Sequence, residues 1–529
     1  MNGQNGDRLS WGDALFLYLE RAGMPLNIAS VSIFEGQIAL EDCMRFIESR
    51  LPLLPRYYQR VVVPPLNIGL PAWDYDPGFD IRNHFTEVKL KRGTESELKS
   101  LAGKIFSNVM DRQRPLWDFT LVSGLHGNRS ALITRIHHCL ADGIAGVGLM
   151  NLLMDPSPEP LSLPKRKRPR PSRRQNDPLT QMLDGWLSNY SNIIGRALSA
   201  YSDVSTIVAR VASGETLPTE KLSKLLPELT APTERLFFNV TYQGPQKFAF
   251  AKISVADIKG VRQRCGATFN DIVLALMTST IARYSASHGE RLKGRFLRMM
   301  VPVNVRGEAG SGELGNRILL LPVTVPLGID NPKRLLAEVH QRMEFLKSAH
   351  VAELFGLAGG MVGAVPAALQ ALVGPVASLL PITPFNLVCT NIRGPEGPLY
   401  LLGHKMLDWY PYVPVGGEMA LNCAILSYNG VAYFGFSGDV HAAPDLGHLE
   451  GLLKQSFEDL KQDIEKSSPQ KHKARTKMSR KTVSAPPAKG SGLQHPTSEP
   501  SKSVTITQLA PAEQMTSADV LTPTTVAAD

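Results

Sequence analysis

A strand pattern and a helix pattern meet at one short motif in the first third of the chain. Residues 130–137, SALITRIH, have recurring apolar side chains in a pattern that predicts a strand. Residues 143–154, GIAGVGLMNLLM, have the apolar spacing of a buried helix. The heptapeptide HHCLADG, residues 137–143, is therefore predicted to form the loop between a strand and a helix.

The other patterns in this part of the chain also mix helices with strands. Helical spacing is found in residues 10–22 and again in residues 96–110, whereas residues 28–36, IASVSIFEG, have the pattern of a strand. Residues 116–125 form a further strand pattern, and the tripeptide HGN that follows is a hairpin signal. The first domain is therefore expected to combine both kinds of element.

Composition divides the chain into four parts. We expect a first domain at 1–155, a basic linker and helical crossover at 156–236, a second domain at 237–466 and a disordered tail at 467–529. The second domain opens with the strand pattern KFAFAKIS, and Ser254 and Asp257 are spaced to cap the helix after it.

The positive charge of the chain is concentrated in two low-complexity stretches. A formal net charge of +9 suits an anionic partner, which can be nucleic acid, an anionic lipid head group or a polyphosphorylated ligand. Much of the excess is in residues 165–174, KRKRPRPSRR, and residues 471–481, KHKARTKMSRK. Both stretches are flanked by Pro and Ser, so the charge need not belong to a folded surface.

Cysteine usage and the N-terminus favour a cytoplasmic protein. The 5 cysteines are scattered and form no CxxC pair, so neither a disulfide framework nor a zinc cluster is predicted. The first residues lack a basic region followed by an uninterrupted apolar one, which argues against a secretory signal.

A long uncharged stretch at 354–392 exceeds the length of a membrane-spanning helix. It is interrupted by Pro366, Pro375, Pro381 and Pro384, which break it into short pieces. We expect short helices beside an apolar cavity, or helices that dip into a membrane surface, rather than a true span.

Two adjacent histidines with a nearby aspartate suit acid/base catalysis, a metal site or packing. Neighbouring side chains of an extended strand point to opposite sides, so His137 and His138 are not expected to chelate one ion. No HExxH motif lies nearby, and we predict no metal. Asp142 is placed to cap the helix and to orient the loop so that one imidazole keeps a fixed tautomer. Cys139 is the alternative nucleophile, although sequence adjacency gives no sign of hydrogen-bond reach.

The tetrapeptide TFND provides a second candidate group. Thr268 and Asp271 have the spacing of a capping box at the start of a helix, which predicts a structural role for Asp271. Asn270 would then project from the helix N-terminus, where backbone N–H groups and an amide stabilise developing negative charge.

The motif HHxxxDG resembles the active-site motif of the coenzyme A-dependent acyltransferases, which include chloramphenicol acetyltransferase and peptide-synthetase condensation domains. Four further segments resemble the bacterial-type wax ester synthase/diacylglycerol acyltransferases, in that family's order: DRQRPLWDFTLVSGL, TFNDIVLALMTSTIARY, LRMMVPVNVRGEAGSGELGNRI and CTNIRGPEGPLYLLGHKM. The chain departs from the family at MPLNIAS, where a Met-His pair is usual, and at CTN, where Ser-Asn is usual.

The resemblance implies an α/β fold of two similar chloramphenicol-acetyltransferase-like domains. Each would be a mixed sheet flanked by helices, with the active-site tunnel and His138 at their interface. It implies that His138 is the general base and His137 a supporting residue, with Asn270 nearby in an oxyanion or positioning role. From its residues, RPLW is predicted to be a strand entrance with Pro115 and Trp117 packing the tunnel wall, and NIRGP, residues 391–395, to be a turn between strands.

The implied activity is transfer of a long-chain acyl group from acyl-CoA to diacylglycerol, to a long-chain alcohol, or to both. Acyl-CoA is then a substrate, so no cofactor is expected, and the residues that bind its phosphates stay open, as does the oligomeric state. Peripheral attachment to a membrane or lipid-droplet surface is expected, and no nucleic acid. The alternatives are a condensation-type or polyketide-associated acyltransferase with a carrier-bound donor, and a catalytically inactive lipid-binding protein.

Overall fold

The computed structural model describes residues 8–67, 69–161, 233–304, 318–348, 369 and 385–467. Several expectations concern segments outside these residues. They are the two basic runs, the helical crossover, the disordered tail beyond residue 467 and most of the uncharged stretch at 354–392.

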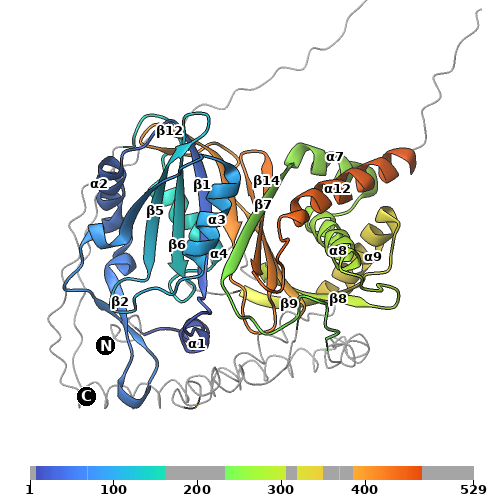
Figure 1. Ribbon diagram of the computed structural model, residues 1–529, viewed down its shortest axis with the longest axis horizontal. Helices are drawn as coiled ribbons and strands as arrows, with labels where there is room; N and C mark the ends of the chain where they lie inside the picture. The colour runs from blue at the N-terminus through green and yellow to red at the C-terminus, as the bar shows by residue number, and fades with distance from the viewer. Residues whose placement is uncertain are drawn as a thin grey trace, which may run out of the picture. The chain divides into compact units, whose positions relative to one another are not determined.

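A mixed, 6-stranded sheet forms in the first half of the chain (Figure 1). Its strands, in spatial order, are β11 (Tyr400–Leu401), β12 (His404–Tyr412), β1 (Asn27–Glu35), β6 (Arg129–His137), β5 (Trp117–Leu125) and β4 (Phe85–Lys89). All neighbours are antiparallel except β4 and β5, which are parallel. The second half of the sequence contributes β11 and β12, so the first sheet is completed by residues far along the chain.

Helices cover both faces of this first sheet. On one face lie α2 (Leu40–Arg50) and α4 (Gly143–Leu153), and on the other lies α3 (Glu95–Phe106). Within α4 only Leu149, Met150 and Leu153 are buried, so the expected buried helix is buried along its second half alone. The helix α1 (Trp11–Leu19) precedes β1.

A small hairpin and four short 3-10 helices complete the first half. These elements are β2 (Gln59–Val62), β3 (Ala72–Tyr75), η1 (Leu51–Leu53), η2 (Pro55–Tyr58), η3 (Pro65–Asn67) and η4 (Ile81–His84). The tip of the hairpin is apolar, with Leu66 79% exposed.

The second half has its own mixed, 6-stranded sheet. In spatial order its strands are β7 (Gln246–Ser254), β14 (Val431–Asp439), β13 (Leu421–Tyr428), β10 (Leu387–Arg393), β8 (Phe296–Asn304) and β9 (Ile318–Pro326). The helices α7 (Val255–Cys265), α8 (Phe269–Ser287), α9 (Pro332–Ser348) and α12 (His448–Ser467) gather beside it and share one apolar core with it (Figure 1).

Local sequence signals explain where these helices begin. The side chain of Ser254 accepts a hydrogen bond from the Asp257 N–H group, as predicted. The predicted capping box is also present, because the Asp271 N–H bonds to Thr268 while the Asp271 carboxylate accepts the Thr268 N–H. This box fixes the first turn of α8 and the direction of Asn270.

The two halves meet where α3 packs against β7. The Phe106 ring lies 5.2 Å from the ring of Phe248 in β7 and 4.2 Å from the ring of Tyr412 in β12. A Cβ atom on Gly103 would lie 2.8 Å from the carbonyl oxygen of Gln246, so only glycine allows this close approach of helix and strand.

The prediction of a turn at NIRGP is wrong for its first three residues. Strand β10 continues through Arg393, because Asn391, Ile392 and Arg393 stay paired with β13. The chain leaves the strand at Gly394.

The helices can be compared with the thickness of a bilayer. Within the described ranges, no single helix has both the length and the apolar composition needed to cross a membrane. Helices α7 and α8 meet those criteria only together, as a pair bent by 103°.

Candidate active site

The HHCLADG segment forms the loop between β6 and α4, as predicted. Strand β6 ends at His137, and α4 begins at Gly143. Asp142 is the N-cap of α4, because its Oδ1 atom accepts the Ala145 N–H at 2.7 Å. The carboxylate is buried, so the cap fixes the end of the loop against the helix.

His138 is held from two sides by residues near the N-terminus. Its backbone N–H donates to the Leu26 carbonyl at 3.0 Å. Its ring stacks on Phe16 of α1, with centroids 3.8 Å apart and planes inclined by 8°. The residue is half-buried and its Nδ1 atom is fully buried, so Nε2 is the candidate nitrogen for contact with a substrate.

The imidazole of His138 is neutral at physiological pH. Burial lowers the pKa of His138 to about 4, its own backbone carbonyl acts in the opposite direction, and His137 lowers the pKa further. A neutral ring has a free lone pair, which is the form that a general base requires.

His137 is completely buried and makes different contacts. Its Nδ1 atom accepts the Cys139 N–H at 3.1 Å, so in the neutral ring the proton is on Nε2. That Nε2 atom lies 3.3 Å from Oε1 of Glu20, which is an ion-pair contact that does not meet hydrogen-bond geometry.

Glu20 is a functional candidate that the sequence reasoning missed. It follows the last residue of α1, and its carboxylate also accepts the Leu26 N–H at 3.1 Å and pairs with Arg112 at 3.0 Å. Burial acts to raise the pKa of Glu20, but the contacts with His137, Leu26 and Arg112 outweigh it and lower the pKa to about 2. The one local signal in the sequence is a carboxylate directly after an otherwise apolar helical stretch.

Both histidines therefore contact the same helix end. The expectation that they point to opposite sides assumed an extended backbone, and the strand stops at His137. Phe16 and Glu20 are four residues apart, which places them on one face of a helical turn. This face contacts the ring of His138 through Phe16 and the ring of His137 through Glu20.

Cys139 is a poor nucleophile in this setting. The side chain is buried, and burial raises the pKa of the Cys139 thiol well above its usual value. The thiol stays protonated, whereas a nucleophilic cysteine acts as its thiolate. In the part of the chain that the structure describes, no group of three or more His, Cys, Asp or Glu side chains is arranged to hold a metal ion.

Asn270 is tied to β10 at the start of α8. Its Oδ1 atom accepts a hydrogen bond from Nδ2 of Asn391 at 3.2 Å. The next residue of β10, Ile392, lies against α4, since a Cβ atom on Gly143 would be 2.4 Å from its Cδ1 atom. Strand β10 thus connects Asn270 with the end of the HHCLADG loop. Among the described residues no hydrogen bond joins Asn270 to His138, and its direct role stays a prediction.

Trp117 belongs to a buried aromatic cluster at the start of β5. Its Nε1 atom donates to the Tyr57 carbonyl at 2.8 Å, and its ring stacks on His84 with centroids 4.1 Å apart. The RPLW segment therefore anchors β5 beside β6, the strand that ends at His137. That Trp117 packs the wall of a tunnel stays a prediction.

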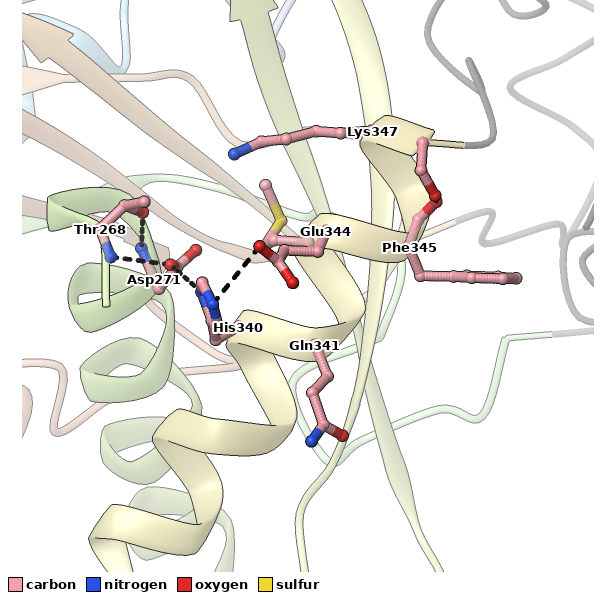
Figure 2. A pocket seen from close by; sticks show the side chains of 9 residues that line it. Thr268, Asp271, His340, Gln341, Glu344, Phe345 and Lys347 are labelled. Atoms are coloured by element: carbon pink, nitrogen blue, oxygen red, sulfur yellow. Dashed lines mark hydrogen bonds and ion pairs between the residues drawn. The ribbon is translucent and has the colours of Figure 1, made fainter. Parts of the chain in front are cut away.

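A pocket of about 720 Å³ lies away from this loop, between the first turn of α8 and the end of α9. Its lining residues are Thr268, Asp271, His340, Gln341, Met343, Glu344, Phe345, Lys347 and Ser348. Figure 2 shows the Asp271 carboxylate between Thr268 and His340, whose Nδ1 atom lies 2.7 Å from it. The pocket contains neither histidine of the loop, so its volume alone does not make it the reaction site.

The fold resembles that of two kinds of solved structures. The wax ester synthase/diacylglycerol acyltransferase from Marinobacter aquaeolei VT8 superposes with a TM-score of 0.58 at 23% identity, over 87% of this chain and 100% of that chain. The first condensation domain of the calcium-dependent antibiotic synthetase gives a TM-score of 0.53 at 14% identity, over 87% and 97%. The predicted two-domain, chloramphenicol-acetyltransferase-like fold is confirmed.

Comparison with protein families identifies one family for this fold. Residues 9–273 match the wax ester synthase/diacylglycerol acyltransferase catalytic domain, and residues 314–461 match the WS/DGAT C-terminal domain. Two proteins of Mycobacterium tuberculosis named probable diacylglycerol O-acyltransferase, tgs1 and tgs2, are each 28% identical to this chain. They match over 83% and 87% of this chain and over 92% and 99% of their own lengths. The chain belongs to the wax ester synthase/diacylglycerol acyltransferase family, and the predicted family and acyltransferase activity are confirmed.

Proposed function

We propose that this enzyme transfers a long-chain acyl group from acyl-CoA to the hydroxyl of diacylglycerol, of a long-chain alcohol, or of both. The observation that carries the proposal is the neutral, oriented imidazole of His138, partly exposed at the end of β6. Family membership and the names of the mycobacterial relatives support these substrates.

The reaction needs one base that later acts as an acid. Nε2 of His138 takes the hydroxyl proton while the alcohol oxygen bonds to the thioester carbon. The tetrahedral intermediate then breaks its C–S bond, and the protonated ring returns the proton to the departing sulfur, which leaves as the coenzyme A thiol. Atoms and charge balance without a covalent enzyme intermediate, which agrees with a buried, protonated Cys139.

Asn270 is the candidate donor to the oxyanion. Its Oδ1 atom is engaged by Asn391, so the Nδ2 group is the part of the amide left to donate. A donor at the N-terminus of α8 has the polarity that stabilises negative charge on the former carbonyl oxygen.

Lipid analysis tests the substrate assignment. The chain is expressed in a host that lacks storage lipids, grown with and without added fatty alcohol. We expect triacylglycerol without the alcohol, wax ester when it is supplied, or both. Neither product from folded protein would contradict the assignment. Purified protein assayed with acyl-CoA and with a carrier-bound acyl donor then separates an acyl-CoA enzyme from a condensation-type enzyme, and no turnover with either would favour a lipid-binding protein.

Attachment to a lipid surface is proposed from the sequence. The net charge of +9 and the basic run at 165–174 suit anionic head groups, whose attraction decays within a Debye length. We expect the protein to sediment with anionic vesicles and to be released by high salt. Neutralising Lys165, Arg166, Lys167, Arg168 and Arg170 together should weaken that binding and flatten its salt dependence. Unchanged binding in the variant would exclude this run as the contact.

A further inference from the structure

Two series of buried polar contacts lead from Glu20 to the backbone around His138. Its Oε1 atom accepts the Leu26 N–H at 3.1 Å and lies 3.3 Å from Nε2 of His137. The carbonyl of Leu26 accepts the His138 N–H at 3.0 Å, and Nδ1 of His137 accepts the Cys139 N–H at 3.1 Å. One carboxylate oxygen therefore braces the backbone on both sides of His138.

The carboxylate also selects one tautomer of His137. Nδ1 can accept the Cys139 N–H only when it carries the lone pair, which requires the proton to be on Nε2. A carboxylate whose oxygen lies 3.3 Å from Nε2 favours a proton on that nitrogen by its negative charge, and Glu20 stays anionic because its pKa is lowered to about 2. The opposite tautomer would leave the Cys139 N–H without this acceptor and would loosen the turn at His138.

We propose that Glu20 is a positioning residue for acyl transfer, acting through His137 to hold the turn that presents His138. The inference rests on the proposed role of His138 as the general base. It assigns a task to the first histidine of the motif, which is fully buried and cannot reach a substrate as a base. It also explains why a carboxylate is buried at the end of α1, next to the phenylalanine on which His138 stacks.

Glu20→Gln tests the proposal, since the amide keeps the size of the side chain and removes its charge. We expect kcat to fall by about 10–100-fold with little change in the KM for acyl-CoA, because small displacements of a catalytic group have effects of this order. The matched control is Asp155→Asn, which disrupts a buried ion pair with Arg50 at 2.6 Å; the other hydrogen bonds of this pair in the described residues go to Leu152, Leu161 and Tyr400. The control should lower the melting temperature and keep kcat.

A double-mutant cycle separates positioning from stability. His137→Asn retains an acceptor near the Cys139 N–H and removes the contact with Glu20. If Glu20 acts through His137, adding Glu20→Gln to His137→Asn should cost little further kcat. Multiplicative losses in the double variant, or a wild-type kcat in folded Glu20→Gln, would overturn the proposal.

Two further variants keep the test decisive. If Glu20→Gln does not fold, Glu20→Asp keeps the charge but is too short to brace both sides of the turn, and its kcat should fall by about tenfold. A wild-type kcat for folded Glu20→Asp would then overturn the proposal. His138→Ala reports on the underlying mechanism: if it retains turnover, the proposed base is wrong, whereas an inactive His138→Ala with a fully active Glu20→Gln rejects only the role of Glu20.

Discussion

Two histidine–carboxylate contacts in this chain differ in what surrounds them. His137 and Glu20 are both buried, and the residue after His137 in the chain is His138, whose ring stacks on Phe16. His340 contacts the buried carboxylate of Asp271 at 2.7 Å, but its own side chain is 34% exposed and lines an open pocket. The contact between His340 and Asp271 has the shorter distance and lies at the pocket of about 720 Å³.

The difference shows that neither a close histidine–carboxylate contact nor a pocket volume identifies the reaction site. Asp271 already caps α8 through Thr268, and its contact with His340 ties α9 to that cap. Glu20, by contrast, accepts the Leu26 N–H, and the carbonyl of Leu26 accepts the N–H of His138. We propose His138 as the reaction site because its imidazole is neutral and stacked on Phe16 and the residue is only half-buried.

The largest effect on activity is expected at His138, and it distinguishes the HHCLADG loop from the region around His340. His138→Ala should lower acyl transfer by about 10²–10⁴-fold with the fold intact, because a positioned base contributes that much. His137→Ala should be milder. The matched control is His340→Ala, which should lose stability and keep kcat. Steady-state kinetics with circular dichroism check all three, and near-normal turnover in folded His138→Ala would refute the mechanism.

The next effect concerns the end of α8 that faces β10. Asn270→Ala should lower kcat by about 10²–10³-fold if its amide donates to the oxyanion, and Asn270→Asp should be at least as damaging because a carboxylate repels that charge. Asn391→Ala, which frees the Asn270 amide, should have a smaller effect. Equal kcat for wild type and Asn270→Ala would remove Asn270 from the reaction.

The smallest effect is expected at the N-cap of α4. Asp142→Ala should lose about 0.5–2 kcal/mol of stability, whereas Asp142→Asn can still accept the Ala145 N–H and should lose less. Thermal melting and kcat are measured together. Complete and equal loss of activity in both variants, with unchanged melting, would give the carboxylate charge a direct part in catalysis.

The parts of this structure that were predictable depend on neighbours in sequence. The caps at Ser254, Thr268 and Asp142 follow from spacings of three residues, and the strand–loop–helix order around His138 follows from apolar periodicity. Each requires only contacts within one or two turns of chain.

The unpredicted parts depend on segments that are distant in sequence. Glu20 reaches His137 only because α1 folds against the end of β6, and no local pattern carries that information. Likewise β12 joins the first sheet beside β1, so the sheet draws on residues from both halves of the chain. The end of β10 was misjudged because pairing with β13 overrides the turn preference of NIRGP.

The pH dependence of kcat/KM tests the central claim, that His138 is a neutral and oriented base, most directly. Burial lowers the pKa of His138 from 6.5 to about 4, so the free enzyme keeps its base deprotonated far below neutrality. The unfolded chain binds a proton at His138 near pH 6.5, whereas the folded chain does so only near pH 4. The folded state therefore loses stability relative to the unfolded state as the pH falls from 6.5 toward 4. Activity must therefore be checked for recovery on return to neutral pH.

We predict a constant kcat/KM from pH 8 to about pH 5 and a reversible fall near pH 4. A reversible fall centred near pH 6.5 would contradict the account.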